Sequence, residues 1–284
     1  MSKIAVVTDS TSYIPKELRE KYPITVVPQV VIWEGQTYED DVTITPEQFY
    51  TRLRTAKVMP STSQASVVNM HKAFSTLLEQ GYEVLGIFVS GKLSGTYQSA
   101  VLGREQLTSG TEKVDFIDSE TTAMAMGFMV LAVARAAMDG ASLADCKALA
   151  EKSRNYVGVY LTVDTLEFLH RGGRIGGAQR FLGTALNLKP ILAVEGGRVE
   201  AVERVRTRAK ALDRVVELVA EKCAGKSPVH MATLHADSEA DAKVMLDKIT
   251  PLVNPIESVF AAVSPAVGAN AGPGTVGLAW MAGM

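Results

Sequence analysis

"EVLGIFVSGKLSGTYQSAVLGREQL", Glu83–Leu107, reads as a buried strand, a polar loop and a helix. The apolar run at its start is typical of a strand that is covered on both faces of a parallel sheet. The same order recurs from Lys3, where "KIAVVT" precedes "DSTSYIP" and a helical segment near Pro15. It recurs again from Lys113, where "KVDFIDS" precedes an apolar helix. Continuous apolar strands that alternate with helices predict an α/β layer with a largely parallel sheet.

The pattern changes after about Tyr156. "YVGVYLTV" predicts a strand, "DTLEFLH" a short helix, and "PILAVEGGRVEAVERVR" a hairpin that turns at Gly196 and Gly197. Two later strands, "HMATLHA" and "SVFAAVS", flank the helical "SEADAKVMLDKIT". A hairpin mixed with helices indicates an α+β domain. We therefore expect two domains, an N-terminal largely parallel α/β sheet domain over 1–155 and a C-terminal α+β domain over 156–284.

The composition excludes several classes of function. The chain has 284 residues, 47% of them hydrophobic and 21% charged, which is ordinary for a globular protein and long enough for two domains. A net charge of -2 gives no general attraction to nucleic acid or to anionic membranes. The most apolar segment, Ala123–Ala134, is shorter than the roughly 20 residues of a membrane span, so we expect no stable membrane insertion. Two distant cysteines, Cys146 and Cys223, and an N-terminus without a secretory apolar run favour a reduced, cytoplasmic protein.

Hydroxyl side chains gather in the loops that follow the predicted strands. "TDSTS", "SGKLSG" and "DSETT" stand at the carboxyl ends of strands, the edge of an open α/β sheet where ligands bind. "PSTSQ" adds a similar loop before another predicted helix. We expect Ser61, Thr62 and Ser63 at the start of that helix and Ser94 at the start of the next, where free backbone N–H groups favour an anion. Helix capping is the competing interpretation, because serine and threonine are favoured N-caps.

The sequence motifs of several other familiar kinds of site are incomplete in this chain. "GIFVSGKL" nearly matches a P-loop, but leucine follows the lysine where a hydroxyl should hold magnesium. "GPGTVG" matches the dinucleotide glycine pattern, but it lies near the C-terminus with no second strand or ribose-binding acid after it. Ser94 does not stand in a G-x-S-x-G elbow, and the histidines and cysteines lack metal-ligand spacing. We expect no metal and no cofactor.

Arginines form two sets of interest. The first surrounds four glycines in "LHRGGRIGGAQR", and glycine lets a backbone approach another group closely. A loop that ends the preceding helix is the competing interpretation. The second set has period-two spacing, which places it on one face of a strand that is either solvated or docks an acidic partner. The two sets are Arg171, Arg174 and Arg180, and Arg204, Arg206 and Arg208.

Seven motifs, taken together, resemble the DegV family. They are "VVTDSTS", "PSTSQAS", "SGKLSGTYQSA", "DSETT", "LEFLHRGGRIGG", "LKPIL" and the terminal "GPGTVG", and they follow that family's order over nearly the whole chain. The family includes the lipid-binding subunits of bacterial fatty acid kinase. The resemblance implies one buried long-chain fatty acid, such as palmitate, and a glycine-rich tail that returns to the ligand site. It also implies no chemistry in this chain alone, because a separate kinase subunit would phosphorylate the bound carboxylate.

The resemblance also implies the ligand-binding residues. The family's carboxyl-binding hydroxyls fall on Thr62 and Ser94, with Ser61 and Gly95 beside them, and its head-group arginine falls on Arg171. This chain departs from the family pattern before "GPG", where Asn270 stands in place of the usual histidine. Asparagine can donate a hydrogen bond to a carboxylate, but it cannot carry a proton or a positive charge. Asn270 completes the expected ligand-binding set.

Three interpretations stay open at this level. The leading one is a fatty acid carrier, with the Met-rich helix of Met124, Met126 and Met129 either as a wall of the lipid pocket or as plain core. The alternative is an enzyme that acts on a small anionic metabolite at the hydroxyl-rich loops, with Asp9 or Asp118 as its base. The third is a regulatory module that docks a partner through the second arginine set.

Overall fold

The first sheet is parallel throughout, as the repeated strand and helix order predicts. In the computed structural model, which describes residues 3–183 and 188–284, its strand order is β2-β1-β6-β7. Thr8 of the inner strand β1 lies opposite Val26 on one side and Ile87 on the other. The inner strands are buried on both faces, which explains their continuous apolar runs. The strands are β1 (Lys3–Asp9), β2 (Ile24–Val27), β6 (Tyr82–Phe88) and β7 (Val114–Asp118).

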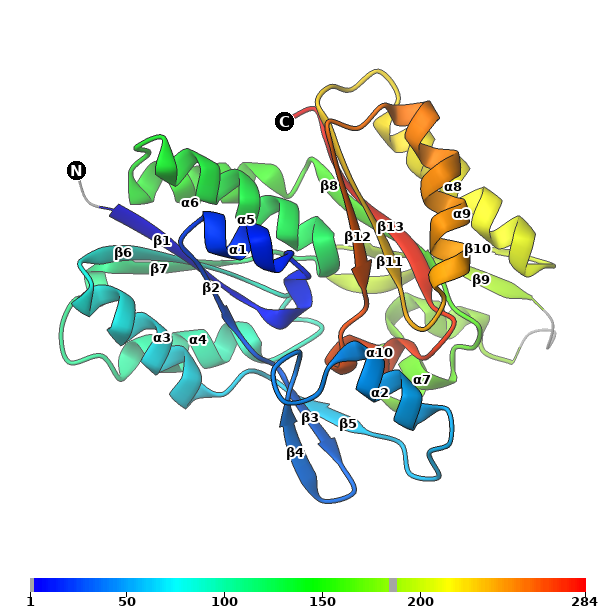
Figure 1. Cartoon of the computed structure of the whole chain (residues 1–284), viewed down its shortest axis with the longest axis horizontal. Helices are drawn as coiled ribbons and strands as arrows, with labels where there is room; N and C mark the ends of the chain where they lie inside the picture. The colour runs from blue at the N-terminus through cyan, green and yellow to red at the C-terminus, as the bar shows by residue number, and fades with distance from the viewer. Residues whose placement is uncertain (1–2, 184–187) are drawn as a thin grey trace.

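Helices cover both faces of this sheet. Helices α3 and α4 pack on one face and α5 and α6 on the other, with the short α1 beside β2 (Figure 1). Helix α3 buries Met70, Phe74 and Leu77, whose spacing places them on one face of the helix. The helices are α1 (Lys16–Lys21), α3 (Val67–Glu79), α4 (Thr96–Glu105), α5 (Ala123–Met138) and α6 (Leu143–Ser153), with 3-10 turns η1 (Ser10–Ser12) and η2 (Thr111–Lys113).

A small antiparallel sheet projects below the first one, and the sequence analysis did not predict it. Its order is β4-β3-β5, and Val31 at its centre pairs with Tyr38 on one side and Thr62 on the other (Figure 1). The strands are only three or four residues long, too short for a clear alternation of side chains. They are β3 (Val30–Trp33), β4 (Gln36–Glu39) and β5 (Ser61–Ser63), and α2 (Pro46–Leu53) lies between β4 and β5 in the chain.

The second large sheet is mixed and has six strands in the order β10-β9-β8-β13-β11-β12. The predicted hairpin is present, since β9 and β10 pair antiparallel around Gly196 and Gly197. The C-terminal strand β13 lies between β8 and β11, although the sequence analysis placed no strand after "GPGTVG". The strands are β8 (Val157–Thr162), β9 (Lys189–Glu195), β10 (Arg198–Val205), β11 (Val229–His235), β12 (Glu257–Ala262) and β13 (Val276–Ala282).

The remaining helices belong to the second half of the chain. Helices α8 and α9 pack on the outer face of the six-stranded sheet, and α7 and α10 contact each other at its lower edge (Figure 1). Because β10 ends at Val205, only Arg204 of the second arginine set lies in a strand, and the predicted basic strand face is wrong. Arg208 begins a helix and pairs with Asp241. The elements are α7 (Glu167–Arg171), η3 (Gly176–Phe181), α8 (Arg208–Cys223), α9 (Glu239–Val253) and α10 (Pro265–Ala271).

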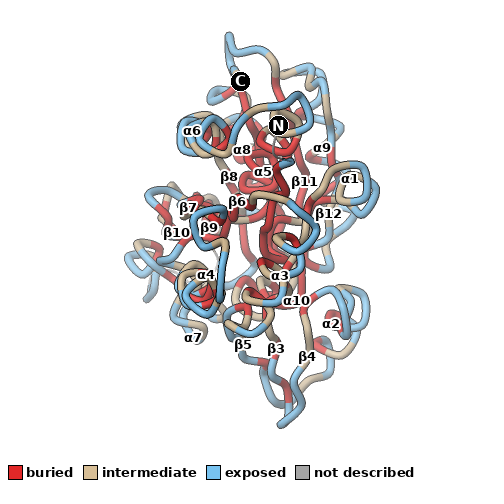
Figure 2. Tube along the Cα trace, turned by 90° about the vertical axis from the view of Figure 1, so that its left-hand side faces the viewer, coloured by how far each residue is buried: buried red, intermediate tan, exposed pale blue. Residues whose placement is uncertain are grey.

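Helix α5 forms the core between the two large sheets. It contacts β1 and β6 of the first sheet and β8, β11 and β13 of the second, so both its sides are covered. Figure 2 shows the buried residues concentrated along the centre of the molecule, around this helix. Met124, Met126 and Met129 are fully buried there, and none of them lines the cavity described below. The core interpretation of the Met-rich helix is confirmed, and its interpretation as a pocket wall is wrong.

The structure therefore has the expected fold class, with a parallel sheet in the first half and a separate mixed sheet in the second. The chain passes from the first large sheet to the second between α6 and β8. The division into domains over 1–155 and 156–284 stays a prediction. Both cysteines are buried and free. None of the described helices is long and apolar enough to cross a membrane.

Candidate functional site

A cavity lies where the carboxyl ends of the parallel strands face the six-stranded sheet. Segments that follow all four parallel strands line it, and three of these segments are the hydroxyl-rich loops that the sequence analysis placed there. Thr11 comes after β1, Gln29 after β2, Ser94 after β6 and Thr122 after β7. Thr62 and Ser63 of β5 add further hydroxyls. The first domain thus supplies most of the polar groups at this cavity.

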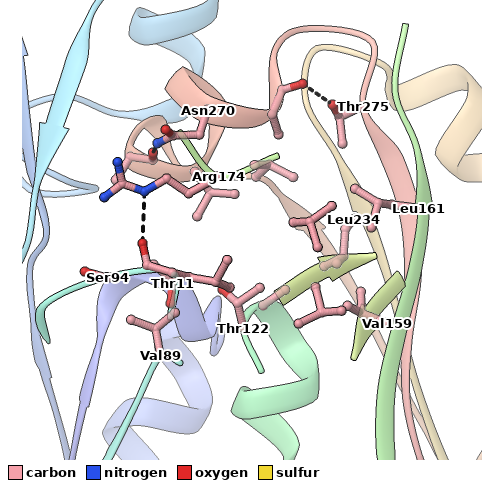
Figure 3. Close-up of a pocket in the computed structure, with 18 of the residues that line it drawn as sticks. Thr11, Val89, Ser94, Thr122, Val159, Leu161, Arg174, Leu234, Asn270 and Thr275 are labelled. Carbon is pink, nitrogen blue, oxygen red and sulfur yellow. Dashed lines mark hydrogen bonds between the residues drawn. The ribbon is translucent and has the colours of Figure 1, made fainter. Parts of the chain in front are cut away.

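The second half of the chain supplies an apolar wall. The cavity volume is about 130 Å³, roughly ten times the space that one buried water needs on the same measure. Figure 3 shows Ser94, Arg174 and Asn270 at one end and Val159, Leu161 and Leu234 at the other. An apolar space of this kind favours a hydrocarbon chain over water. The other apolar side chains of the wall are Leu169, Val194, Val199, Val263 and Val267.

Thr62 lies in strand β5, which corrects the predicted position at a helix start. Ser66 caps the following helix instead, since its Oγ accepts a hydrogen bond from Asn69 N at 3.0 Å. The capping interpretation therefore applies to Ser66 and leaves the hydroxyls of β5 uninvolved in capping. Thr62 Oγ1 accepts a hydrogen bond from Asn270 Nδ2 at 3.2 Å.

Ser94 stands just before α4, as predicted, on a loop that the second sheet holds in place. Ser90 Oγ donates to Gly197 O at 2.8 Å, and Lys92 Nζ donates to Gly196 O at 2.7 Å. The turn of the β9–β10 hairpin therefore anchors the loop that carries Ser94. Gly95 is exposed and lines neither this cavity nor the outer pocket defined below. Its assignment as a ligand-binding residue therefore stays a prediction.

The arginine at the cavity is Arg174, whereas the family resemblance pointed to Arg171. Arg174 Nε donates to Leu93 O at 3.0 Å and its Nη1 to Gly172 O at 2.6 Å, and its guanidinium faces the polar end (Figure 3). It forms no ion pair with any carboxylate among residues 3–183 and 188–284. The "RGGR" motif contains both arginines, but the sequence could not show which one turns inward.

A second pocket, here called the outer pocket, lies beside the polar end of the cavity and is lined partly by exposed residues. Three residues, Thr62, Arg174 and Asn270, line both spaces and form the boundary between them. Ser61 and Arg171 line only the outer pocket. The structure thus gathers five of the six predicted residues, but it divides them between an inner and an outer space.

Helix α10 places Asn270 at this boundary. Asn270 Nδ2 also donates to Ala266 O at 3.0 Å. A Cβ atom on Gly172 would lie 2.0 Å from Asn270 Oδ1, so a glycine is required where α7 meets α10. Asp40 fixes the other end of α10 by accepting a hydrogen bond from Ala266 N at 2.8 Å. Burial raises the pKa of the Asp40 carboxyl to about 6, against the lowering effect of hydrogen bonds from Ser10 and Ala266.

The two aspartates that could act as a base in the alternative interpretation, an enzyme for a small anionic metabolite, lie away from the cavity. Asp9 is fully buried, and its carboxylate accepts hydrogen bonds from Thr11 N, Thr11 Oγ1 and Val89 N. Asp118 accepts from Gly91 N and Glu120 N. Neither aspartate lines the cavity, so neither is placed to act as a base on a ligand bound there. Within residues 3–183 and 188–284, no cluster of three or more potential metal ligands occurs.

Known proteins match this chain over its whole length. The model of the DegV family, described as an uncharacterised protein family, matches residues 3–283. Protein DegV of Bacillus subtilis is 34% identical over 282 residues, which cover 98% of each chain. A fatty acid binding DegV family protein from Thermus thermophilus has a TM-score of 0.92 and 35% identity, with 99% of both chains covered.

The solved structure of the Bacillus subtilis protein adds to this likeness. DegV, a fatty acid binding protein from that organism, has a TM-score of 0.90 and 31% identity, with 99% of this chain and 100% of that chain covered. The motifs, the arrangement of the sheets and these relatives agree along the whole sequence. The chain belongs to the DegV family.

Proposed function

We propose that this protein binds one long-chain fatty acid, such as palmitate, in the cavity between its two large sheets. The observation that carries the proposal is Arg174, a half-buried positive charge at the polar end of an otherwise apolar space, which has no carboxylate partner among residues 3–183 and 188–284. A carboxylate placed there would supply the missing negative charge. The fatty acid binding relatives support this choice of ligand.

In this proposal, the hydroxyls of Thr62 and Ser94 bind the carboxylate, Asn270 supports Thr62 from behind, and Arg174 lies close by. Both hydroxyls and the asparagine line the cavity at the same end. A hydrogen bond to a charged group contributes about 1.5–3 kcal/mol, roughly twice a neutral one. The polar end therefore sets the orientation of the bound ligand, with its carboxylate at that end.

The apolar wall would hold the hydrocarbon tail. A buried methylene contributes about 0.8 kcal/mol, so a tail of about 14 methylenes offers on the order of 11 kcal/mol before the costs of binding. Val159, Leu161 and Leu234 at that end carry no polar side-chain atoms to oppose it. The tail would supply most of the affinity and the head group most of the specificity.

Mass spectrometry tests the carrier function directly. The purified protein is denatured and extracted with organic solvent, and the extract is expected to contain one long-chain fatty acid per chain. An empty extract, repeated after incubation with palmitate and oleate, would contradict fatty acid binding.

The proposal further includes hand-over of the lipid to a kinase subunit supplied by another protein. Its support is the outer pocket, which borders the proposed head-group site and carries the exposed Arg171. Within the part of the chain that the structure describes, the one ion pair of Arg171 is with Glu167 on its own helix, at 2.5 Å, and its side chain is 59% exposed. In this proposal, the chain presents the carboxylate, and catalysis belongs to the partner.

Arg171→Ala is expected to leave the affinity for palmitate unchanged and to impair acyl phosphate formation in an assay with a fatty acid kinase. The reason is that Arg171 lines the outer pocket and not the lipid cavity. Arg198→Ala, on the exposed side of β10, is the matched control. Unchanged acyl phosphate formation by the Arg171 variant would exclude this residue from hand-over.

A further inference from the structure

A chain of hydrogen bonds lies directly behind the polar end of the cavity. Gln29, which is 4% exposed, connects β2 to β3, and its side chain lines the cavity. Gln29 Nε2 donates to Thr96 Oγ1 at 2.8 Å, and Thr96 Oγ1 lies 2.9 Å from Ser94 Oγ. Thr96 is fully buried. No motif in the sequence marks Gln29, so this chain is visible only in the structure.

Hydrogen bonds hold the Gln29 backbone and its side-chain amide in this position. The Gln29 backbone N–H donates to Ser10 Oγ at 3.0 Å, which fixes the residue in the turn between β2 and β3. The Nε2 end of its amide donates to Thr96 Oγ1 at 2.8 Å, and the Oε1 end lies 3.4 Å from Ser94 Oγ. The nitrogen end of the amide therefore faces Thr96, and the oxygen end faces Ser94.

The hydroxyl of Thr96 then has only one direction for its proton. Its oxygen accepts from Gln29 Nε2 and, at 3.4 Å, from Ala65 N. A hydroxyl has two lone pairs and one proton, so the remaining contact, to Ser94 Oγ, takes the proton of Thr96. Ser94 therefore accepts from Thr96 and keeps its own proton for another acceptor. Gln29 Oε1, to which Ser94 Oγ donates in the structure, is 3.4 Å away, which is long for such a bond.

Thr62 also accepts a hydrogen bond from the protein and keeps its own proton available, for an independent reason. The two hydrogens of Asn270 Nδ2 are donated to Ala266 O and to Thr62 Oγ1, at 3.0 and 3.2 Å. Thr62 also accepts, and its proton is free to point elsewhere. The two hydroxyls at the polar end thus both offer a donor. A group with two oxygens that only accept, such as an ionised carboxylate, matches them.

We propose that Gln29 is a specificity-determining residue that acts through Thr96 to hold the Ser94 hydroxyl as a donor into the cavity. This inference rests on the proposed fatty acid site. Donors that are oriented before the ligand arrives lose nothing to reorganisation when it binds. The arrangement favours an ionised carboxylate, whose charged oxygens accept from both donors, over a primary alcohol, whose neutral oxygen forms weaker hydrogen bonds.

The test is a double-mutant cycle with Gln29→Met and Ser94→Ala, in which the dissociation constants of palmitate and hexadecanol are measured by calorimetry. Gln29→Met keeps the side-chain length and removes the donor. It is expected to weaken the binding of palmitate about fivefold, which corresponds to the loss of one neutral hydrogen bond, and to leave the binding of hexadecanol nearly unchanged. In the Ser94→Ala background the same change is expected to have no further effect. Gln98→Met, on an exposed position of α4, is the matched control.

Three outcomes are decisive. The role of Gln29 would be overturned if Gln29→Met caused the full additional loss of palmitate affinity in the Ser94→Ala background. It would also be overturned if Gln29→Met lowered the affinities for palmitate and hexadecanol equally. Weaker palmitate binding by Ser94→Ala together with unchanged binding by Gln29→Met would also overturn it, while the proposed carrier function would stand. If the wild-type protein binds no palmitate, both proposals fail. Thr96→Val breaks the same chain at its middle and serves if Gln29→Met does not fold by circular dichroism.

Discussion

Thr62→Val combined with Ser94→Ala is expected to weaken palmitate binding by about 10² to 10⁴-fold. Each change removes one donor to a charged group, which contributes about 1.5–3 kcal/mol. Valine has nearly the shape of threonine and favours strands, so β5 is retained. Hexadecanol forms only neutral hydrogen bonds of about 1 kcal/mol each, so the double variant is expected to bind it at most about 30-fold more weakly than the wild-type protein does. Calorimetric titration of both ligands measures the difference.

The control for this variant lies in the same small sheet. Thr37, in β4, is exposed and far from the lining of the cavity, so Thr37→Val is expected to bind palmitate like the wild-type protein. Equal losses of acid and alcohol in the double variant would show that the two hydroxyls do not recognise the carboxylate. Unchanged affinity for both ligands would place the head group elsewhere.

Leu161→Trp is expected to weaken palmitate binding by about two orders of magnitude. Leu161 lies in β8 at the apolar end of the cavity (Figure 3), where an indole ring would occupy space proposed for the tail. If the ring excludes about four methylenes, the loss is about 3 kcal/mol. The penalty grows with chain length, so octanoate is expected to be affected much less than palmitate.

Two comparisons separate a blocked tail from a damaged fold. Val68→Trp adds the same ring on an exposed position of α3 and is expected to leave binding unchanged. Thermal unfolding of Leu161→Trp shows whether the sheet tolerates the substitution. Equal losses for octanoate and palmitate would mean that the change does not act by shortening the space for the tail.

Strong local patterns determined most of the fold at the level of sequence. Continuous apolar runs followed by polar loops and helices predicted β1, β6, β7 and the helices that cover them. The glycine pair predicted the β9–β10 hairpin. The small sheet of β3, β4 and β5 was missed because its strands are too short to show a period. Strand β13 was missed because its place between β8 and β11 depends on pairing with residues more than 40 positions away.

For the candidate site, the sequence determined which residue types are present, and the tertiary structure decided which way they face. The motifs brought Thr62, Ser94 and Asn270 forward as ligand-binding candidates, and all three line one cavity. The choice of Arg174 over Arg171 depends on how α7 ends, and the part played by Gln29 depends on a hydrogen bond to a residue 67 positions away. Sequence patterns report local periodicity and turn chemistry. The direction of a hydroxyl proton and the pairing of a buried charge depend on neighbours that only folding brings together.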